Sequence, residues 1–491
     1  MNNKTYCVYH LHSDLSNGVT NIDSVTKYKE YVEYAKSLGM TALAFAEHGN
    51  IFEWIHKKES IEGAGMKYIH AAEAYLTTDS NADEKHRDNY HCVLIAKNYD
   101  GVKELNKLVS SSFNRSDHHY YYAPRISFDE LYSTSDNIII TTACLGGVLN
   151  KAENNIKTEF LRFLIKNKHR CYLEIQHHNC RDQAVYNKTL YAIHQKTGIP
   201  LIAGTDTHCL NDTHVEGRNI LQKGKGVFFS DEEAWDLTFK TYDELVEAYE
   251  KQGALPEEVY LEAINNTNVM AESIEPFELD YSKKYPKLYK DSEKALKEKI
   301  AKGVKARGVD KYDNYDEYKK RIQYELETYK YNGAVDFLLL EEDYKSALKE
   351  QGVSFGYSRG SVSGSVIAYL LGITEVDSIK YNLNFERFMN KERVSLADVD
   401  TDWSKKDRYK VREYMFNKDG VYCCDIITFN TIALKGAIKD VGRALGLSVD
   451  ETQTISDAVY QDENKKDCID EFYIKKYPEL FKYVDIVKGT I

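Results

Sequence analysis

Short apolar runs recur through the first 210 residues, and each carries or adjoins a side chain that can bind a metal. Amphipathic stretches such as Val25–Leu38 lie between them, with apolar residues three and four positions apart and a stop at Gly39. Repeated strand–helix units predict parallel strands with helices outside, and ligands at strand ends predict a barrel with its active site at the C-terminal rim. The runs are Tyr6–Leu11, Ala42–Ala46, Tyr68–Ala72, His91–Ile95, Ile138–Thr142, Cys171–Gln176 (which carries Glu174) and Leu201–Gly204.

The side chains at these strand ends are typical of a polynuclear metal site. Imidazole suits zinc, manganese and iron, carboxylates can bridge two ions, and a thiolate favours zinc. Clustered divalent ions activate water and clamp a phosphate, so the pattern predicts phosphoester hydrolysis. A single buried histidine is more often an ordinary core residue, and the hypothesis therefore rests on the number of candidates. They are His10, His12, His48, Glu73, His91, Cys144, Asp206 and His208, of which His91 is unusual because it opens its run.

The pattern changes near residue 275 to long charged helices, expected over Ser292–Arg307 and Tyr315–Tyr331. We place a domain boundary there. Phe355–Leu371 is expected to be a Gly/Ser loop that leads into an apolar helix. A third, mainly helical section begins near Ile426.

Three carboxylates alternate along an expected strand, Ser395–Trp403, and would share one face of it: Asp398, Asp400 and Asp402. Their repulsion would be costly without cations, and a pair of magnesium ions would relieve it. A solvated edge strand with outward acids is the alternative. In the Gly/Ser loop, small residues allow backbone N–H groups to approach phosphate oxygens, and Arg359 adds charge. The loop lacks the GxxxxGK[ST] pattern, which disfavours an ordinary NTPase.

Composition narrows the class of protein. The 491 residues allow two to four domains, and a net charge of −12 argues against a protein that simply coats nucleic acid. No signal pattern opens the sequence, and no apolar run approaches the roughly 18 residues of a membrane helix. Nine cysteines without paired spacing read as reduced thiols. We therefore expect a cytoplasmic location, in a host cell if a virus encodes the protein, and no membrane association.

The motifs HLHSD, AEHGN, AAEAYL, HCVLIAKN, TTACLGG and GTDTH resemble the PHP (polymerase and histidinol phosphatase) domain. The resemblance implies an α/β fold over residues 1–275, a distorted (β/α)7 barrel with a trinuclear centre of Zn2+ or Mn2+. In the branch attached to bacterial replicative polymerases, some members are 3′–5′ exonucleases and others are degenerate scaffolds. The family's early Asp-Gly aligns with Asn17-Gly18, so Asn17 or Asp14 is expected to fill that ligand position. Glu47 stands where the family more often has Asp.

The segment from GYSRGSVSGSV to SLADVDTDW, continued by IITFNTIALKGAIKDVGRALGL, resembles the palm and thumb of bacterial DNA polymerase III alpha subunits, the C-family polymerases. The resemblance implies an incomplete α+β, nucleotidyltransferase-like palm at 276–429 and a helical thumb at 430–491. In the loop, Tyr357 and Ser358 replace the family's Pro-Gly. The implied roles are catalysis with Mg2+ by Asp398 and Asp400, nucleotide binding by Arg359, Gly360 and Ser361, and DNA-backbone contact by Lys435, Lys439 and Arg443.

Members of that family carry a third catalytic aspartate, fingers, a clamp-binding region and an OB-fold beyond the thumb. We therefore expect this chain to need a C-terminal polymerase fragment for synthesis on primer-template DNA with dNTPs. That fragment would also provide contacts to a sliding clamp and other replisome proteins. A split gene, a split-intein half and a truncated record are the alternatives. A stand-alone metal-dependent phosphoesterase or exonuclease and a non-catalytic replication scaffold are the competing functions.

Overall fold

The computed structural model describes residues 4–78, 88–227, 235–282, 284–392 and 398–491. Contacts divide the chain into two units. Unit 1 contains the residues up to Glu278 together with Thr428–Ile491, and unit 2 is Leu279–Ile427. These limits lie close to the expected boundaries, but the section expected to form a separate thumb packs within unit 1.

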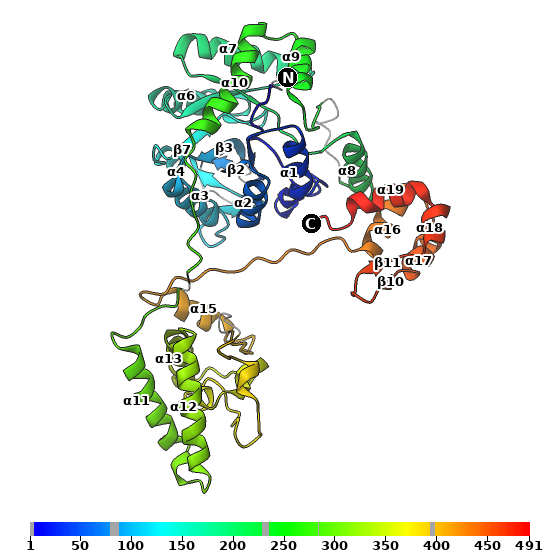
Figure 1. Cartoon of the computed structure of the whole chain (residues 1–491). Helices are drawn as coiled ribbons and strands as arrows, with labels where there is room; N and C mark the ends of the chain where they lie inside the picture. Colours follow the sequence, from blue (N-terminus) through cyan, green and yellow to red (C-terminus); the bar gives the residue numbers. More distant parts are fainter. Residues whose placement is uncertain (1–3, 79–87, 228–234, 283, 393–397) are drawn as a thin grey trace. The chain divides into compact units, whose positions relative to one another are not determined.

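Unit 1 is built around one curved mixed sheet whose strands come from the predicted apolar runs (Figure 1). Its strands are buried on both faces, as expected for a sheet enclosed by helices. A short strand, β6 (Ile126–Ser127), pairs with β2 outside the main order. The main order is β1 (Ala42–Phe45), β2 (Lys67–Thr77), β3 (Tyr90–Ala96), β7 (Ile138–Thr141), β8 (Cys171–Gln176) and β9 (Leu201–Gly204).

The expectation of uniformly parallel strands is wrong for β3. It pairs antiparallel with both β2 and β7, whereas β1–β2, β7–β8 and β8–β9 are parallel. Antiparallel neighbours need no crossover helix, so β3 can follow β2 directly. This reversal explains why His91 opens its run: the start of β3 lies at the same edge as the ends of its neighbours β2 and β7.

The first apolar run, Tyr6–Leu11, forms isolated bridges rather than a regular strand. Val8 bridges Leu43 of β1, and Leu11 bridges Thr207, just after β9. The segment therefore lies between the first and last strands of the sheet and connects its two edges, as a barrel requires. The α/β barrel class predicted from the sequence is confirmed.

Helices cover the sheet, and their apolar faces complete its core. The predicted helix at Val25–Leu38 is confirmed, although it begins later, at Tyr28, and is followed by Gly39 with a positive φ of 73°. The pair β4 (Tyr120–Tyr121) and β5 (Ala123–Pro124) lies apart from the main sheet. The helices are α1 (Tyr28–Ser37), α2 (Trp54–Gly63), α3 (Tyr99–Ser112), α4 (Phe128–Tyr132), α5 (Val148–Lys151), α6 (Asn154–Lys166), α7 (Arg181–Thr197), α8 (Asp212–Lys225), α9 (Tyr242–Gln252) and α10 (Glu257–Ser273), with a 3-10 turn at Asp14–Gly18.

The C-terminal section of unit 1 packs on α8 through a separate apolar cluster (Figure 1). Val25 and Leu221 from the barrel side join Ile438, Val441 and Val484 in this cluster. The section contains α16 (Leu434–Ala444), α17 (Val449–Asp457), β10 (Tyr460–Gln461), β11 (Asp467–Cys468), α18 (Glu471–Lys476) and α19 (Pro478–Val487).

Unit 2 is mainly helical, and both long helices predicted there are confirmed. The expected strand at Ser395–Trp403 is not: residues 395–397 lie outside the described residues, and 398–402 have no regular structure. Of the described residues in this stretch, Trp403 alone forms a bridge, which is antiparallel and joins it to Phe355. No helix in the described parts of either unit is long and apolar enough to span a bilayer. The helices of unit 2 are α11 (Ser292–Ala306), α12 (Tyr315–Tyr331), α13 (Val335–Glu350), α14 (Val366–Leu370) and α15 (Arg408–Phe416), with 3-10 turns at Val309–Lys311, Gly360–Gly364 and Phe385–Arg387.

Candidate metal centre and carboxylate loop

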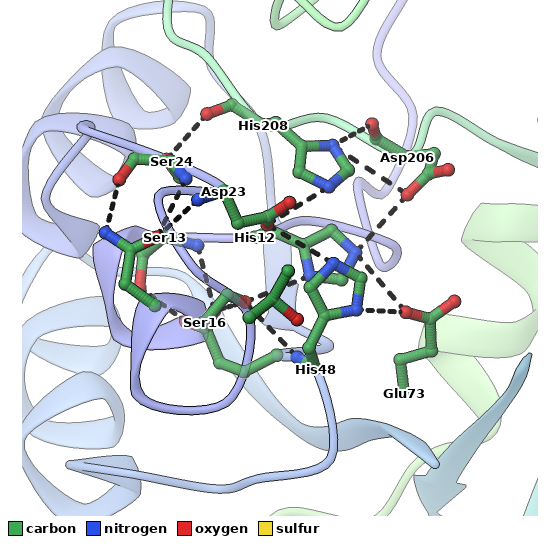
Figure 2. A network of polar contacts seen from close by, with 12 residues as sticks. His12, Ser13, Ser16, Asp23, Ser24, His48, Glu73, Asp206 and His208 are labelled. Atoms are coloured by element: carbon green, nitrogen blue, oxygen red, sulfur yellow. Dashed lines mark hydrogen bonds and ion pairs between the residues drawn. The ribbon is translucent and has the colours of Figure 1, made fainter. Parts of the chain in front are cut away.

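Buried histidines and carboxylates from distant parts of unit 1 converge at one edge of the sheet (Figure 2). They form three overlapping groups, and within each group the ligand atoms lie within 4.8 Å of one another. His12, His48 and Glu73 each belong to two groups, so the groups adjoin. The sets are His12–Asp23–His48–His208, His10–His12–Glu73 and His48–Glu73–His91.

Asp206 and Cys144 lie against these groups. Asp206 Oδ1 is 3.2 Å from His10 Nε2 and 3.3 Å from His12 Nε2. Cys144 Sγ is 3.4 Å from His91 Nδ1 and 3.9 Å from Glu73 Oε1. The structure thus brings together all eight ligand candidates named from the sequence.

Asp23 is the residue that sequence reasoning missed. Its Oδ2 lies 3.2 Å from both His48 Nε2 and His208 Nε2. Asn17 serves this loop in another way, because its Oδ1 accepts hydrogen bonds from the backbone N–H groups of Asp23 (2.7 Å) and Ser24 (3.1 Å). Asp14 belongs to none of the three groups, and its burial raises its pKa to about 7.

Several polar atoms that face the centre of the cluster are buried and form no regular hydrogen bond with the described residues, although they lie close to oppositely charged groups, as His48 Nδ1 does at 2.6 Å from Glu73 Oε2. Buried polar atoms are normally satisfied, so a gathering of unsatisfied ones needs an explanation. Nitrogen lone pairs and carboxylate oxygens that converge in this way form the donor set of divalent cations such as zinc or manganese. The residues present therefore fit a metal. The atoms are His10 Nε2, His12 Nε2, Asp23 Oδ2, His48 Nδ1, Glu73 Oε2 and Asp206 Oδ1.

Outer polar groups orient the inner ligands. Glu174 Oε1 lies 2.6 Å from His10 Nδ1, and its other oxygen accepts hydrogen bonds from Tyr9 (2.8 Å) and Thr141 (2.7 Å). With Nδ1 held by Glu174, His10 directs Nε2 toward Glu73 and Asp206. Such outer contacts fix the tautomer and ring orientation of a metal-binding histidine.

A second outer chain holds His12. The Ser16 hydroxyl donates to Glu47 Oε2 at 2.6 Å, so it accepts from His12 Nδ1 at 3.2 Å. That assignment leaves the lone pair of His12 Nε2 directed at the cluster. Glu47 also pairs with Lys57 at 2.6 Å. Glu47, whose side chain is longer than the Asp that the family more often has at this position, therefore joins Ser16 to Lys57.

Charges inside the cluster shift its pKa values in opposite directions. Burial, followed by the neighbouring His48 and His208, lowers the pKa of His12 to about 4, so its ring is neutral at pH 7. Burial alone would raise the pKa of Asp23, but the adjacent His208 and His48 outweigh it and hold that pKa well below its usual range. A neutral imidazole and an ionised carboxylate are the forms that bind metals.

Backbone geometry at the same edge is unusual. Asp206 has φ of 48° and Ala143, which precedes Cys144, has φ of 54°. Non-glycine residues rarely adopt this left-handed region, and such strain clusters at functional sites. The strain therefore falls on one ligand candidate, Asp206, and directly before another, Cys144.

In unit 2, the Gly/Ser loop and the carboxylate segment lie side by side. The Gly356 N–H donates to the Asp402 carbonyl at 2.9 Å, and Arg359 Nη1 is 2.7 Å from Asp402 Oδ1. Gly360 has φ of 71°, and a β-carbon there would lie 3.3 Å from Asp400 Oδ2. Asp398 and Ser361 are exposed. The segment thus places Asp400 against Gly360, while Arg359 pairs with Asp402 rather than with either predicted catalytic aspartate.

The predicted DNA-contacting residues lie on α16, opposite its buried face. Lys435 is exposed and Lys439 is partly buried. Arg443 is exposed, but its Nη1 donates to the Gly224 carbonyl of α8 at 2.9 Å. Arg443 therefore also has a structural role, because its hydrogen bond joins α16 to α8.

Comparison with known proteins identifies two family regions. Residues 9–178 match the PHP domain, and residues 290–488 match the bacterial DNA polymerase III alpha NTPase domain. DNA polymerase III subunit alpha from Borreliella burgdorferi is 32% identical over 98% of this chain and 43% of the relative. The subunit from Aquifex aeolicus is 33% identical over 90% and 40%, and that from Helicobacter pylori strain 26695 is 30% identical over 91% and 39%. The chain spans about two fifths of the length of these relatives.

Proposed function

Because this chain belongs to the bacterial DNA polymerase III alpha family and corresponds to the N-terminal part of its members, we propose that it is the N-terminal portion of a replicative DNA polymerase. We further propose that its barrel is a metal-dependent 3′–5′ exonuclease. The observation that carries the second proposal is the convergence of buried, unsatisfied nitrogen and oxygen atoms at the sheet edge.

The proposed ligands are the eight predicted residues together with Asp23. His12 would bind through Nε2, since its Nδ1 donates to Ser16. Glu73 belongs to two ligand groups, so its carboxylate would be shared between them when metal is bound. Zn2+ or Mn2+ fits the mixed imidazole, carboxylate and thiol set. When bound, such ions lower the pKa of water and clamp a phosphodiester for in-line displacement.

The chain's own residues would prepare this chemistry. Glu174 and the Ser16–Glu47 pair fix the ring orientations of His10 and His12 before any ion arrives. Burial excludes bulk water from most of the cluster, whereas the His91 side chain remains 21% exposed. Substrate access is therefore expected on the side of His91 and Cys144.

Digestion of a 3′-labelled single strand in the presence of Mn2+ or Zn2+ tests the exonuclease proposal. Asp23→Asn removes a charged ligand and should lower the rate more than 100-fold, since loss of an outer partner alone typically costs roughly 10–100-fold in metal affinity or activity. Asp14→Asn is the matched control, because Asp14 lies in the same loop region but outside the ligand groups, and it should retain activity. Equal losses in both variants would reject Asp23 as a ligand.

For DNA synthesis, we propose that Asp398 and Asp400 hold Mg2+ and that Arg359, Gly360 and Ser361 contact the incoming dNTP. The proximity of Asp400 to Gly360 supports this arrangement. Lys435 and Lys439 are proposed to contact the backbone of primer-template DNA, with Arg443 doing so only if it leaves the Gly224 carbonyl. The proposed partners are a C-terminal polymerase fragment and, through it, a sliding clamp and other replisome proteins, in the cytoplasm.

A primer-extension assay tests that proposal. In it, this chain is mixed with a C-terminal polymerase fragment that supplies the part of the family's length that this chain does not span. Asp400→Ala should abolish extension, whereas Asp419→Ala, which removes an exposed carboxylate in unit 2, should preserve it. Extension that survives Asp400→Ala would contradict the assignment.

The nearly complete ligand set favours one second candidate, a stand-alone metal-dependent exonuclease. Digestion without primer extension in the mixture would select it. A chain that binds no metal and neither digests nor extends DNA would instead indicate a replication scaffold.

A further inference from the structure

Unit 1 contains a groove of about 760 Å³ beside the metal centre. Its walls come from the loop after β7, from α5 and α6, from the first turns of α7, and from Trp235. Its volume is within the roughly 300–1,000 Å³ range of ligand sites.

The groove is cationic in a chain whose net charge is −12. Lys151, Lys157 and Arg181 line it, against one carboxylate, Asp182. Lys157 Nζ donates to the Asn150 carbonyl at 2.7 Å, which holds its charge near the groove. Lys151 and Arg181 are exposed. Arg181 also begins the 17-residue helix α7, whose N-terminus has no side-chain cap and adds partial positive charge.

The groove also has an aromatic wall. Trp235 stacks on His178, with ring centroids 5.6 Å apart and planes 16° from parallel. His178 is buried, so this contact fixes the indole, which remains partly exposed. Tyr186 lines the groove too, and it is 3% exposed. A fixed aromatic ring beside cations is the arrangement that binds single-stranded nucleic acid, by base stacking and phosphate contact.

One loop connects the groove to the metal centre. Leu145 lines the groove, and it follows Cys144, whose Sγ lies 3.4 Å from His91 Nδ1. The next residue, Gly146, accepts a hydrogen bond from the His91 N–H at 3.1 Å. The groove therefore borders the side of the cluster where His91 is partly exposed.

We propose that this groove holds single-stranded DNA just upstream of the 3′ end to be cut. Lys151, Lys157 and Arg181 contact its phosphates, and a base stacks on Trp235. This inference rests on the proposed exonuclease function and names the substrate-holding surface of the same site.

Fluorescence anisotropy with a fluorescein-labelled thymidine oligonucleotide and the full chain tests it, in EDTA so that no strand is cut. Arg181→Glu should raise the Kd at least tenfold. Lys188→Glu makes the same charge change at an exposed position of α7 outside the groove, and should change the Kd less than twofold. Trp235→Leu should raise the Kd roughly tenfold, and Trp235→Phe should restore most of the affinity.

The outcomes separate the two proposals. Binding that depends on Arg181 and Trp235 in a protein that never cuts DNA would keep the groove and reject the exonuclease. Cutting by a protein whose binding is equally affected by Arg181→Glu and Lys188→Glu would keep the exonuclease and overturn the groove.

Discussion

In unit 1 all the candidate ligands except His91 are buried, and the outer groups Glu174 and Ser16 hold His10 and His12. In unit 2, by contrast, Asp398 and Asp400 are exposed on a segment without regular structure. A buried set of charges is costly unless the surrounding structure compensates for it, so the barrel must be assembled around its site. The exposed carboxylates of unit 2 carry no such cost. We therefore expect metal binding and stability to be coupled in unit 1 and largely independent of each other in unit 2.

Mild acid should produce the largest difference in stability between the two units. Burial lowers the pKa of His70 to about 4, below its ordinary 6.5, so the unfolded chain takes up the proton first. Stability from this neutral ring is complete above pH 6.5 and is lost as pH falls toward 4, by about 3 kcal/mol. Leu279–Ile427 contains no histidine. Hydrogen exchange at pH 7.5 and pH 5 should therefore show protection lost in unit 1 first.

The control for this effect is His70→Gln, which should flatten the pH dependence of unit 1, against His56→Gln at an exposed position of α2. Equal pH dependence in wild type and His70→Gln would show that another group governs the acid response.

Glu174→Gln should weaken metal binding roughly 10–100-fold, because the charged partner that orients His10 is lost while the ligand itself remains. Isothermal titration with Mn2+ measures the change. Glu159→Gln, an exposed change on α6, should leave the affinity unaltered. An unchanged affinity in Glu174→Gln would contradict the idea that outer contacts prepare the barrel site.

The sequence predicts the ligands that follow regular elements, because strand ends bring residues such as His48 and His208 to one edge. It does not predict Asp23, which lies in an irregular loop. The position of Asp23 depends on long-range contacts: Asn17 accepts its N–H, and Arg218 of α8 donates to its carbonyl. The pattern of apolar and polar residues around Asp23 contains no information about these partners.

The same limit explains the errors elsewhere. The antiparallel direction of β3 depends on its pairing partners, β2 and β7, rather than on its own residues. Asp398, Asp400 and Asp402 alternate as they would in a strand, yet among the described residues the backbone contacts of this segment lie at its end, where Asp402 accepts from Gly356 and Trp403 bridges Phe355. Alternating carboxylates predict that their side chains share one face, but a strand also needs a neighbouring strand with which its backbone can pair.

Gly360→Ala should cost about 1–2 kcal/mol, because alanine is disfavoured at a φ of 71°. Gly352→Ala, at a φ of 75°, should cost about as much, but nothing lies within 4 Å of its β-carbon position. Only the Gly360 change should therefore also impair nucleotide incorporation, by crowding Asp400. Urea unfolding and primer extension measure the two effects. Loss of extension in both variants would assign the effect to strain alone.

Arg359→Gln should have the smallest effect on stability, since the Arg359–Asp402 pair is exposed to solvent. Its removal should instead raise the KM for dNTPs if the guanidinium contacts the triphosphate. A large loss of stability would show instead that this exposed pair organises unit 2.

The most direct test of the account is the anomalous scattering from crystals of the full chain soaked in Mn2+. We predict peaks between His12, Asp23, His48 and His208 and beside Glu73, with Asn17 bonded to the loop backbone rather than to metal. Peaks coordinated by Asp14 or Asn17 in place of Asp23, or no peak at this edge of the sheet, would contradict it.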